Sequence, residues 1–244
     1  SFSRLVGRGE IQQIDVIAEA KAIGFDVIEF STLSLPDGED RHSFAPKLKA
    51  AAEQHELPIA SYTIGADLLN GSDGDLSAEV ERVKDEVRVA QALGVPCMRH
   101  DATRGYPPEK TGARSFDHAL PRLAEGVRAI TEYAAELNIK TTVENHGFFC
   151  QDSERVEKLV AAVDHENFGV LFDMGNFLCG DEDPALAAGR LAGSVFHVHA
   201  KDFHTKPGTA VDPGEGWFRS RAGNYLRGAV IGHGDVPIDR KSVV

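Results

Sequence analysis

The stretch from Phe196 to His204 concentrates side chains that can bind metal ions or transfer protons. Its residues alternate as in a β-strand, which places His197 and His199 on one face, and the pair Lys201-Asp202 follows where a loop should begin. Either histidine alone is as consistent with a hydrogen-bonded core residue as with a metal ligand. The stretch therefore predicts a site only if other strands end in matching ligands.

Other predicted strands do end in polar side chains, and the ends of parallel barrel strands meet at one mouth. Glu144, Asp173 and His199 close three consecutive strands. Two oxygen donors and one nitrogen donor suit Mn²⁺, Mg²⁺, Co²⁺ or Zn²⁺. One strand-terminal carboxylate could instead cap a helix or lie on the surface, but three such residues on adjacent strands favour a divalent-metal site. Further polar residues at predicted strand ends are Glu29, Tyr62, His100, Asp101, Asn145 and His146.

The apolar pattern alternates between strand and helix about every 30–40 residues, the size of a βα unit. No GxGxxG motif follows the first strand, so a (β/α)8 TIM barrel is favoured over a doubly wound sheet. No linker divides the chain, which predicts a single domain over residues 1–244, with a long glycine-rich loop at 203–236. The expected strands are 25–30, 58–64, 95–100, 140–144, 168–173 and 195–199, and the expected helices lie within 14–24, 44–52, 76–94, 120–137, 156–163 and 184–191.

The barrel is expected to be truncated at both ends. The stub Ser1-Phe2-Ser3 would be the end of strand 1, and strand 8 would lie beyond Val244, after a helix that starts near Ser242. Such a chain should bind metal weakly and turn over little, so an inactive fragment remains an alternative. Two open strand edges also favour pairing with another chain, which leaves a homo-oligomer open.

The amino-acid composition limits the classes of molecule that this chain is expected to bind. The net charge of -12 and the pI of about 5.3 argue against a nucleic-acid ligand, which requires a basic face. Three widely spaced cysteines, Cys97, Cys150 and Cys179, are typical of reduced thiols. Because no apolar run could cross a membrane and no signal peptide is evident, we expect a cytoplasmic protein without a membrane partner.

Four motifs resemble those of the xylose-isomerase-like TIM barrels, a superfamily that includes sugar phosphate isomerases and epimerases, inosose dehydratases and endonuclease IV. The motifs are Thr142-Val143-Glu144-Asn145-His146-Gly147, Leu171-Phe172-Asp173-Met174-Gly175-Asn176, His197-Val198-His199-Ala200-Lys201-Asp202 and Ile231-Gly232-His233-Gly234-Asp235-Val236-Pro237. The resemblance implies that Glu144, Asp173 and His199 bind the metal. The superfamily's fourth ligand, a glutamate on the last strand, is not in this chain, and Asn176 stands where many relatives carry a histidine.

The resemblance implies a metal that bridges a carbonyl and an adjacent hydroxyl and stabilises an enediolate. Glu144 would move the proton, with His146 and Lys201 as acid–base partners. Lys201 could equally be an ion-pair partner of Asp202 or Glu144, and His197 is expected to be a supporting or packing residue. The expected substrate-binding residues are Asn176, His100, Trp217, Arg219, Arg221 and His233, although His100 could be an ordinary loop residue and the Trp217–Arg221 segment a flexible surface loop.

The leading hypothesis is an isomerase or epimerase of a sugar, keto-sugar or sugar phosphate. A lyase on the same site is the alternative, either inosose-dehydratase-like or keto-glycoside-cleaving. An endonuclease IV-like repair enzyme is a remote third hypothesis, because Asn176 replaces one expected histidine and the chain is acidic.

Overall fold

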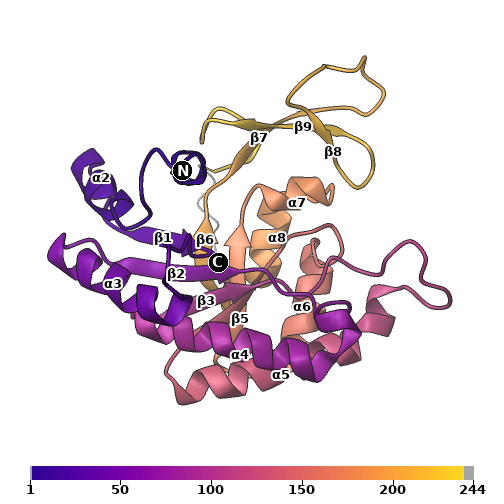
Figure 1. The fold of residues 1–244 in the computed structure, drawn as a ribbon. Helices are drawn as coiled ribbons and strands as arrows, with labels where there is room; N and C mark the ends of the chain where they lie inside the picture. Colours follow the sequence, from indigo (N-terminus) through magenta and orange to yellow (C-terminus); the bar gives the residue numbers. More distant parts are fainter. Residues whose placement is uncertain (1, 239–244) are drawn as a thin grey trace.

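The computed structural model describes residues 2–238, which are built around one parallel, curled sheet (Figure 1). Its six strands lie in chain order, β1-β2-β3-β4-β5-β6. Each pair is parallel, so the carboxyl ends of all six strands lie at the same edge of the sheet. The strands are β1 (Ile28–Ser31), β2 (Ile59–Ile64), β3 (Cys97–His100), β4 (Lys140–Glu144), β5 (Phe168–Asp173) and β6 (Val195–His199).

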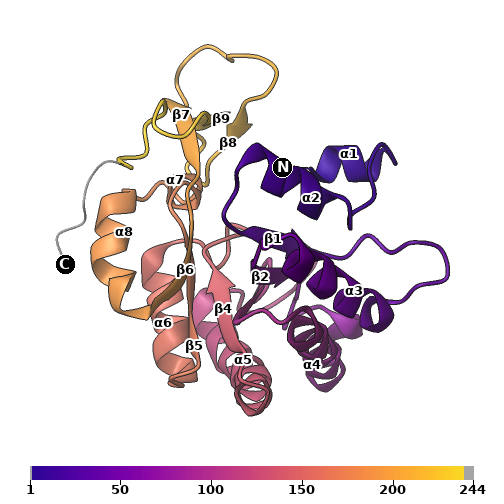
Figure 2. The ribbon, with the colours of Figure 1, turned by 90° about the vertical axis from the view of Figure 1, so that its left-hand side faces the viewer.

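Helices cover the outer face of this sheet, and Figure 2 shows α3, α4, α5, α6 and α8 in an arc around it. Consecutive helices of the arc contact one another. The helices are α1 (Ser3–Gly7), α2 (Val16–Ile23), α3 (Arg41–Gln54), α4 (Leu76–Leu93), α5 (Phe116–Glu136), α6 (Ser153–Val163), α7 (Asn176–Cys179) and α8 (Pro184–Leu191), with short 3-10 turns at η1 (Ser72–Gly74) and η2 (Ala192–Ser194).

Helix α4 shows how the sequence sets these elements. Its N-cap, Asp75, accepts a hydrogen bond from the backbone N–H of Ala78, and Val83 and Val87 in its apolar stripe are fully buried. Gly94 ends the helix at a φ of 74°, a left-handed conformation that glycine adopts without strain. The remaining core consists of similar stripes packed against the strands.

The predicted TIM-barrel architecture is confirmed as a half-barrel of six alternating strands and helices. The expected strand stub at the amino end is wrong. The carbonyl oxygen of Phe2 accepts the N–H groups of Leu5 and Val6, so the backbone is helical there, and α1 begins at Ser3. Ser1 and the helix expected near Ser242 lie outside the described residues.

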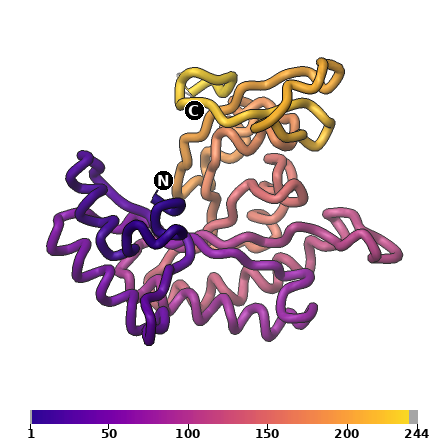
Figure 3. The backbone as a smooth tube through the Cα atoms, turned by 45° about the horizontal axis from the view of Figure 1, so that its top comes forward, coloured from indigo at the N-terminus to yellow at the C-terminus, as the bar shows by residue number. Residues whose placement is uncertain are grey.

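The prediction of a long glycine-rich loop at 203–236 is also wrong, because much of this segment forms a second, antiparallel sheet. Strands β7 (Asp202–Lys206), β8 (Phe218–Arg219) and β9 (Tyr225–Ala229) pair in the order β7-β9-β8. The apolar side chains of Phe203 and Leu226 are buried against Cys179 of α7, which stabilises this small sheet. Figures 1 and 3 show it standing beyond the carboxyl end of β6, directly after that strand in the chain.

Two expectations from composition can be compared with this fold. All three cysteines are buried, and none forms a disulfide within residues 2–238. In the same part of the chain, no helix combines the length and the apolar character needed to cross a bilayer.

Candidate metal centre

Glu144, Asp173 and His199 are the last residues of β4, β5 and β6, and we call them the central cluster. The strand register pairs Asp173 directly with His199. One potential ligand atom from each residue lies within 4.8 Å of the other two. The carboxylates are buried and the imidazole is partly exposed, so the cluster has an open side toward solvent.

Asp173 is held rigidly by backbone groups. Its Oδ1 accepts hydrogen bonds from the N–H groups of Gly175 and Asn176, both at 3.1 Å. Asn145 adds a reciprocal pair, because its side chain donates to the Asp173 carbonyl and accepts from the Asp173 N–H. Asp173 Oδ2 is buried and lies 2.7 Å from Lys201 Nζ, and no other group within residues 2–238 approaches it as a hydrogen-bond donor.

Asn176 links the two sides of the central cluster. Its Nδ2 donates to Glu144 Oε1 at 2.8 Å, and its Oδ1 accepts from Lys201 Nζ at 2.9 Å. Lys201 therefore pairs with Asp173 and Asn176, whereas the sequence suggested Asp202 or Glu144. The carboxylate of Asp202 instead accepts backbone N–H groups of the chain around 203 and 232–236.

Arg99 on β3 is a site residue that sequence reasoning missed. Its side chain is buried, and its Nη2 lies 2.6 Å from Glu144 Oε2 and 2.8 Å from Asp101 Oδ1. Nη1 donates to the Ile64 carbonyl oxygen, while Nε has no hydrogen-bond acceptor in the described part of the chain, residues 2–238. The guanidinium thus offsets the charge of two buried carboxylates.

The central cluster fits a divalent metal ion. It supplies two carboxylate oxygens and one imidazole nitrogen, and among residues 2–238 the buried Asp173 Oδ2 has no close partner besides the Lys201 ammonium. Arg99 and Lys201 oppose cation binding, because each holds a positive charge against one of the carboxylates. A metal ion here would share its ligands with these two cations.

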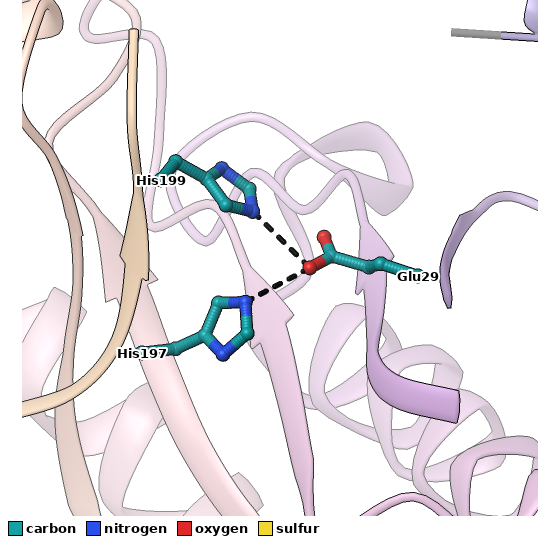
Figure 4. Close-up of side chains that lie close together, drawn as sticks. All are labelled: Glu29, His197 and His199. Carbon is teal, nitrogen blue, oxygen red and sulfur yellow. Dashed lines mark hydrogen bonds and ion pairs between the residues drawn. The ribbon is translucent and has the colours of Figure 1, made fainter. Parts of the chain in front are cut away.

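Glu29, His197 and His199 form a second group, which we call the edge cluster because it joins β1 and β6, the outermost strands of the sheet (Figure 4). Nε2 of His197 and Nε2 of His199 lie 3.0 Å and 3.1 Å from the same atom, Glu29 Oε2. Burial alone would raise the pKa of the Glu29 carboxyl, but the two imidazole hydrogen bonds outweigh it and hold that pKa well below its ordinary value. The bond to Glu29 raises the pKa of His199, against the effect of burial.

The remaining histidines expected near the substrate lie in different surroundings. His146 is half-exposed, and its Nδ1 lies 3.2 Å from Asp101 Oδ1. His100 is fully buried, its Nδ1 lies 3.0 Å from the carbonyl oxygen of Asp101, and desolvation lowers its pKa. His233 is exposed in the turn after β9.

Trp217, Arg219 and Arg221 belong to the small sheet and its connections. Arg219 stacks on the Tyr225 ring, with its guanidinium carbon 3.5 Å from the ring centroid, and Lys206 lies over the Trp217 ring. Arg221 reaches the segment after β4, where Nη1 is 2.8 Å from Asp152 Oδ2. Within residues 2–238, none of these three side chains has a hydrogen bond or ion pair with the central cluster.

Residues 17–240 match the sequence model of the xylose isomerase-like TIM barrels. The chain belongs to this family. Inosose dehydratase from Lacticaseibacillus casei is 28% identical over 87 residues, which is 35% of this chain and 29% of that protein. The match thus spans less than a third of that relative's length.

Two solved structures show the same xylose isomerase-like fold. The probable 3-DHS dehydratase AsbF from Bacillus anthracis aligns with a TM-score of 0.69 at 17% identity, over 94% of this chain and 81% of that one. D-psicose 3-epimerase from Clostridium cellulolyticum H10 aligns with a TM-score of 0.65 at 19% identity, over 79% and 68%. Proteins named as an epimerase and as a dehydratase therefore share this fold.

Proposed function

We propose that this chain is a divalent-metal-dependent isomerase or epimerase of a sugar, keto-sugar or sugar phosphate. The observation that carries the proposal is the convergence of Glu144, Asp173 and His199 at three consecutive strand ends. A bound divalent cation would polarise a substrate carbonyl and acidify the adjacent C–H. The fold shared with D-psicose 3-epimerase supports a substrate of this class.

Glu144 is the proposed base. Its two carboxylate oxygens are fixed separately, Oε1 by Asn176 Nδ2 and Oε2 by Arg99 Nη2, so the group keeps one orientation. A carboxylate held in this way can take a proton from the carbon next to a carbonyl and return it to a neighbouring position.

Lys201 is the proposed partner for the substrate oxygen. Its ammonium has three N–H donors, of which one is directed to Asn176 and another faces Asp173. The side chain is 41% exposed, so the remaining donor can reach a substrate. It would stabilise negative charge that develops on a carbonyl oxygen during proton transfer. His146, held at Asp101, is a further proposed contact for a hydroxyl.

A dehydratase is the second candidate, and the match to inosose dehydratase favours it. Glu144 would remove the same proton, the hydroxyl on the next carbon would leave with a proton from Lys201, and a C=C bond would form with release of water. The two reactions share the removal of the proton by Glu144. They differ afterwards, because the isomerase returns a proton to carbon whereas the dehydratase breaks a C–O bond.

Proton NMR in D₂O separates these reactions. The chain would be incubated with ketohexoses, inososes and sugar phosphates in the presence of Mn²⁺, Mg²⁺, Co²⁺ or Zn²⁺. Deuterium uptake next to the carbonyl with a new isomer supports the isomerase or epimerase, and loss of water supports the dehydratase. Glu144→Gln should abolish either signal, whereas Glu154→Gln, a change at an exposed position on α6, should not. Activity that survives Glu144→Gln would refute the assigned base.

A further inference from the structure

The edge cluster combines two imidazoles and one carboxylate, all directed at a single point (Figure 4). We propose that Glu29, His197 and His199 bind Zn²⁺ at a second site, separate from the carboxylates of the central cluster. Two histidines and one carboxylate are a donor set that proteins use for zinc, with a fourth position left for solvent. This inference does not depend on the proposed reaction.

The distances suit such an ion. Zinc lies about 2.1 Å from nitrogen and oxygen ligands, so neighbouring ligand atoms in a tetrahedral site are about 3.4 Å apart. Glu29 Oε2 is 3.0 Å from one imidazole Nε2 and 3.1 Å from the other, and the three atoms lie within 4.8 Å of one another. Small side-chain rotations are sufficient to admit the ion in place of the two hydrogen bonds.

The surroundings of Glu29 also favour a metal ligand. Its other oxygen, Oε1, accepts a hydrogen bond from Thr63 Oγ1 at 2.8 Å, which directs Oε2 toward the imidazoles. Outer hydrogen bonds of this kind orient ligating carboxylates. The three side chains are 23–32% exposed, and a cavity of about 430 Å³ beside α1 and β1 reaches Glu29, so an ion has a route to the site.

Charge distinguishes the two clusters. Glu144 and Asp173 each contact a permanent cation, Arg99 or Lys201. Within residues 2–238, no lysine or arginine forms an ion pair with Glu29, whose Oε2 faces only the two imidazoles. An imidazole binds zinc through the lone pair of an unprotonated ring nitrogen and adds no charge to the site, whereas guanidinium and ammonium groups repel the ion. Zinc should therefore prefer the edge cluster.

The two clusters share His199. A zinc ion bound to His199 Nε2 at the edge cluster would lie close to a cation at the central cluster, and the two like charges would repel each other. The chain should then bind one zinc ion rather than two, and occupancy of the edge cluster should compete with a metal at Glu144 and Asp173.

Calorimetric titration with Zn²⁺ alone tests this site in the full chain. The double variant E144Q/D173N removes the carboxylates of the central cluster and should still bind one Zn²⁺. Adding H197Q or E29Q should weaken this binding by more than about 100-fold. Loss of a group that only hydrogen-bonds a ligand weakens metal binding by at most about this factor, so a larger loss indicates a direct ligand. Adding H204Q, at an exposed histidine on β7, should leave it unchanged.

Two results would overturn the proposal: no Zn²⁺ bound by folded E144Q/D173N, or equal affinity after H197Q is added. If the double variant does not fold by circular dichroism, His197 ring signals in wild-type NMR spectra decide the matter, since Zn²⁺ must shift them. Mn²⁺ binding by the single variants H197Q and E29Q reports on the central cluster separately. Loss of Mn²⁺ binding in these two variants would count against the proposed function and would leave the proposed zinc site standing.

Discussion

Arg99 Nη2 lies 2.6 Å from Glu144 Oε2, an ion pair between two buried side chains at the centre of the half-barrel. The pair places a fixed positive charge beside the residue proposed as the base. Burying a carboxylate without a partner costs free energy of folding. The charge of Arg99 offsets this cost, so Glu144 can remain ionised at the buried end of β4.

Replacing Arg99 with methionine should lower the free energy of unfolding by about 3–5 kcal/mol, because Glu144 and Asp101 would lose their buried cation. Urea denaturation measures this loss. Arg88→Met is the matched control, since Arg88 pairs with Asp85 on the surface and should cost less than about 1 kcal/mol. Equal losses for the two variants would show that the buried pair has no special weight.

Replacing Lys201 with methionine should strengthen metal binding while weakening turnover. Its ammonium lies 2.7 Å from Asp173 Oδ2, so removing it frees that oxygen and removes a like charge. We expect the Kd for Mn²⁺ to fall by about tenfold, equivalent to about 1.4 kcal/mol. Lys206→Met, on β7, should leave the Kd unchanged. Weaker binding by Lys201→Met would instead mean that the lysine supports the ligand geometry.

Asp202 should make stability depend on acid pH. Burial raises the pKa of its carboxyl, but four backbone N–H groups outweigh burial and hold that pKa below the ordinary value. The carboxylate therefore stabilises the fold above about pH 4, and this contribution is lost as the pH falls through the lowered pKa.

The substitution Asp202→Asn should cost about 1–3 kcal/mol at pH 7 and progressively less below pH 4. Thermal unfolding at pH 7 and pH 3 measures both values. The exposed Asp37→Asn is the control. A cost that is constant across this pH range would argue against the carboxylate as the stabilising group.

Arg221→Met should loosen the small sheet without unfolding the half-barrel. Arg221 bonds Asp152 Oδ2 and the Phe148 carbonyl oxygen, and its N–H donates to the Cys179 carbonyl oxygen. Loss of the side-chain bonds should speed amide hydrogen exchange in β8 and β9, with β1–β6 unchanged. Arg227→Met, at an exposed position on β9, provides the comparison. Unaltered exchange in β8 would contradict this role.

The sequence was sufficient to place Glu144, Asp173 and His199 together, because the ends of adjacent parallel strands are neighbours whatever the loops do. Arg99 was missed although strand alternation contains the signal. Neighbouring residues of a strand face opposite sides, so Arg99 and His100 could not both face the cluster. The register of Arg99 with Thr142 shows that Arg99 shares the face of Glu144.

Other features depend on relationships that local patterns do not contain. The small sheet consists of short strands between glycine-rich turns, and its core residue Leu226 is buried against Cys179 of a different βα unit. The contact of Glu29 with His197 depends on the curl of the whole sheet, which sums the twist of six strands.

The Glu29–His197 contact spans 168 positions of the chain. Forming it closes a loop that contains β2, β3, β4 and β5. The entropy lost in closing this loop is compensated only after these strands have paired. This bond should be absent from the folding transition state. An ion bound there would slow unfolding and leave the folding rate almost unchanged. The edge cluster would then determine how long the assembled sheet persists before it unfolds.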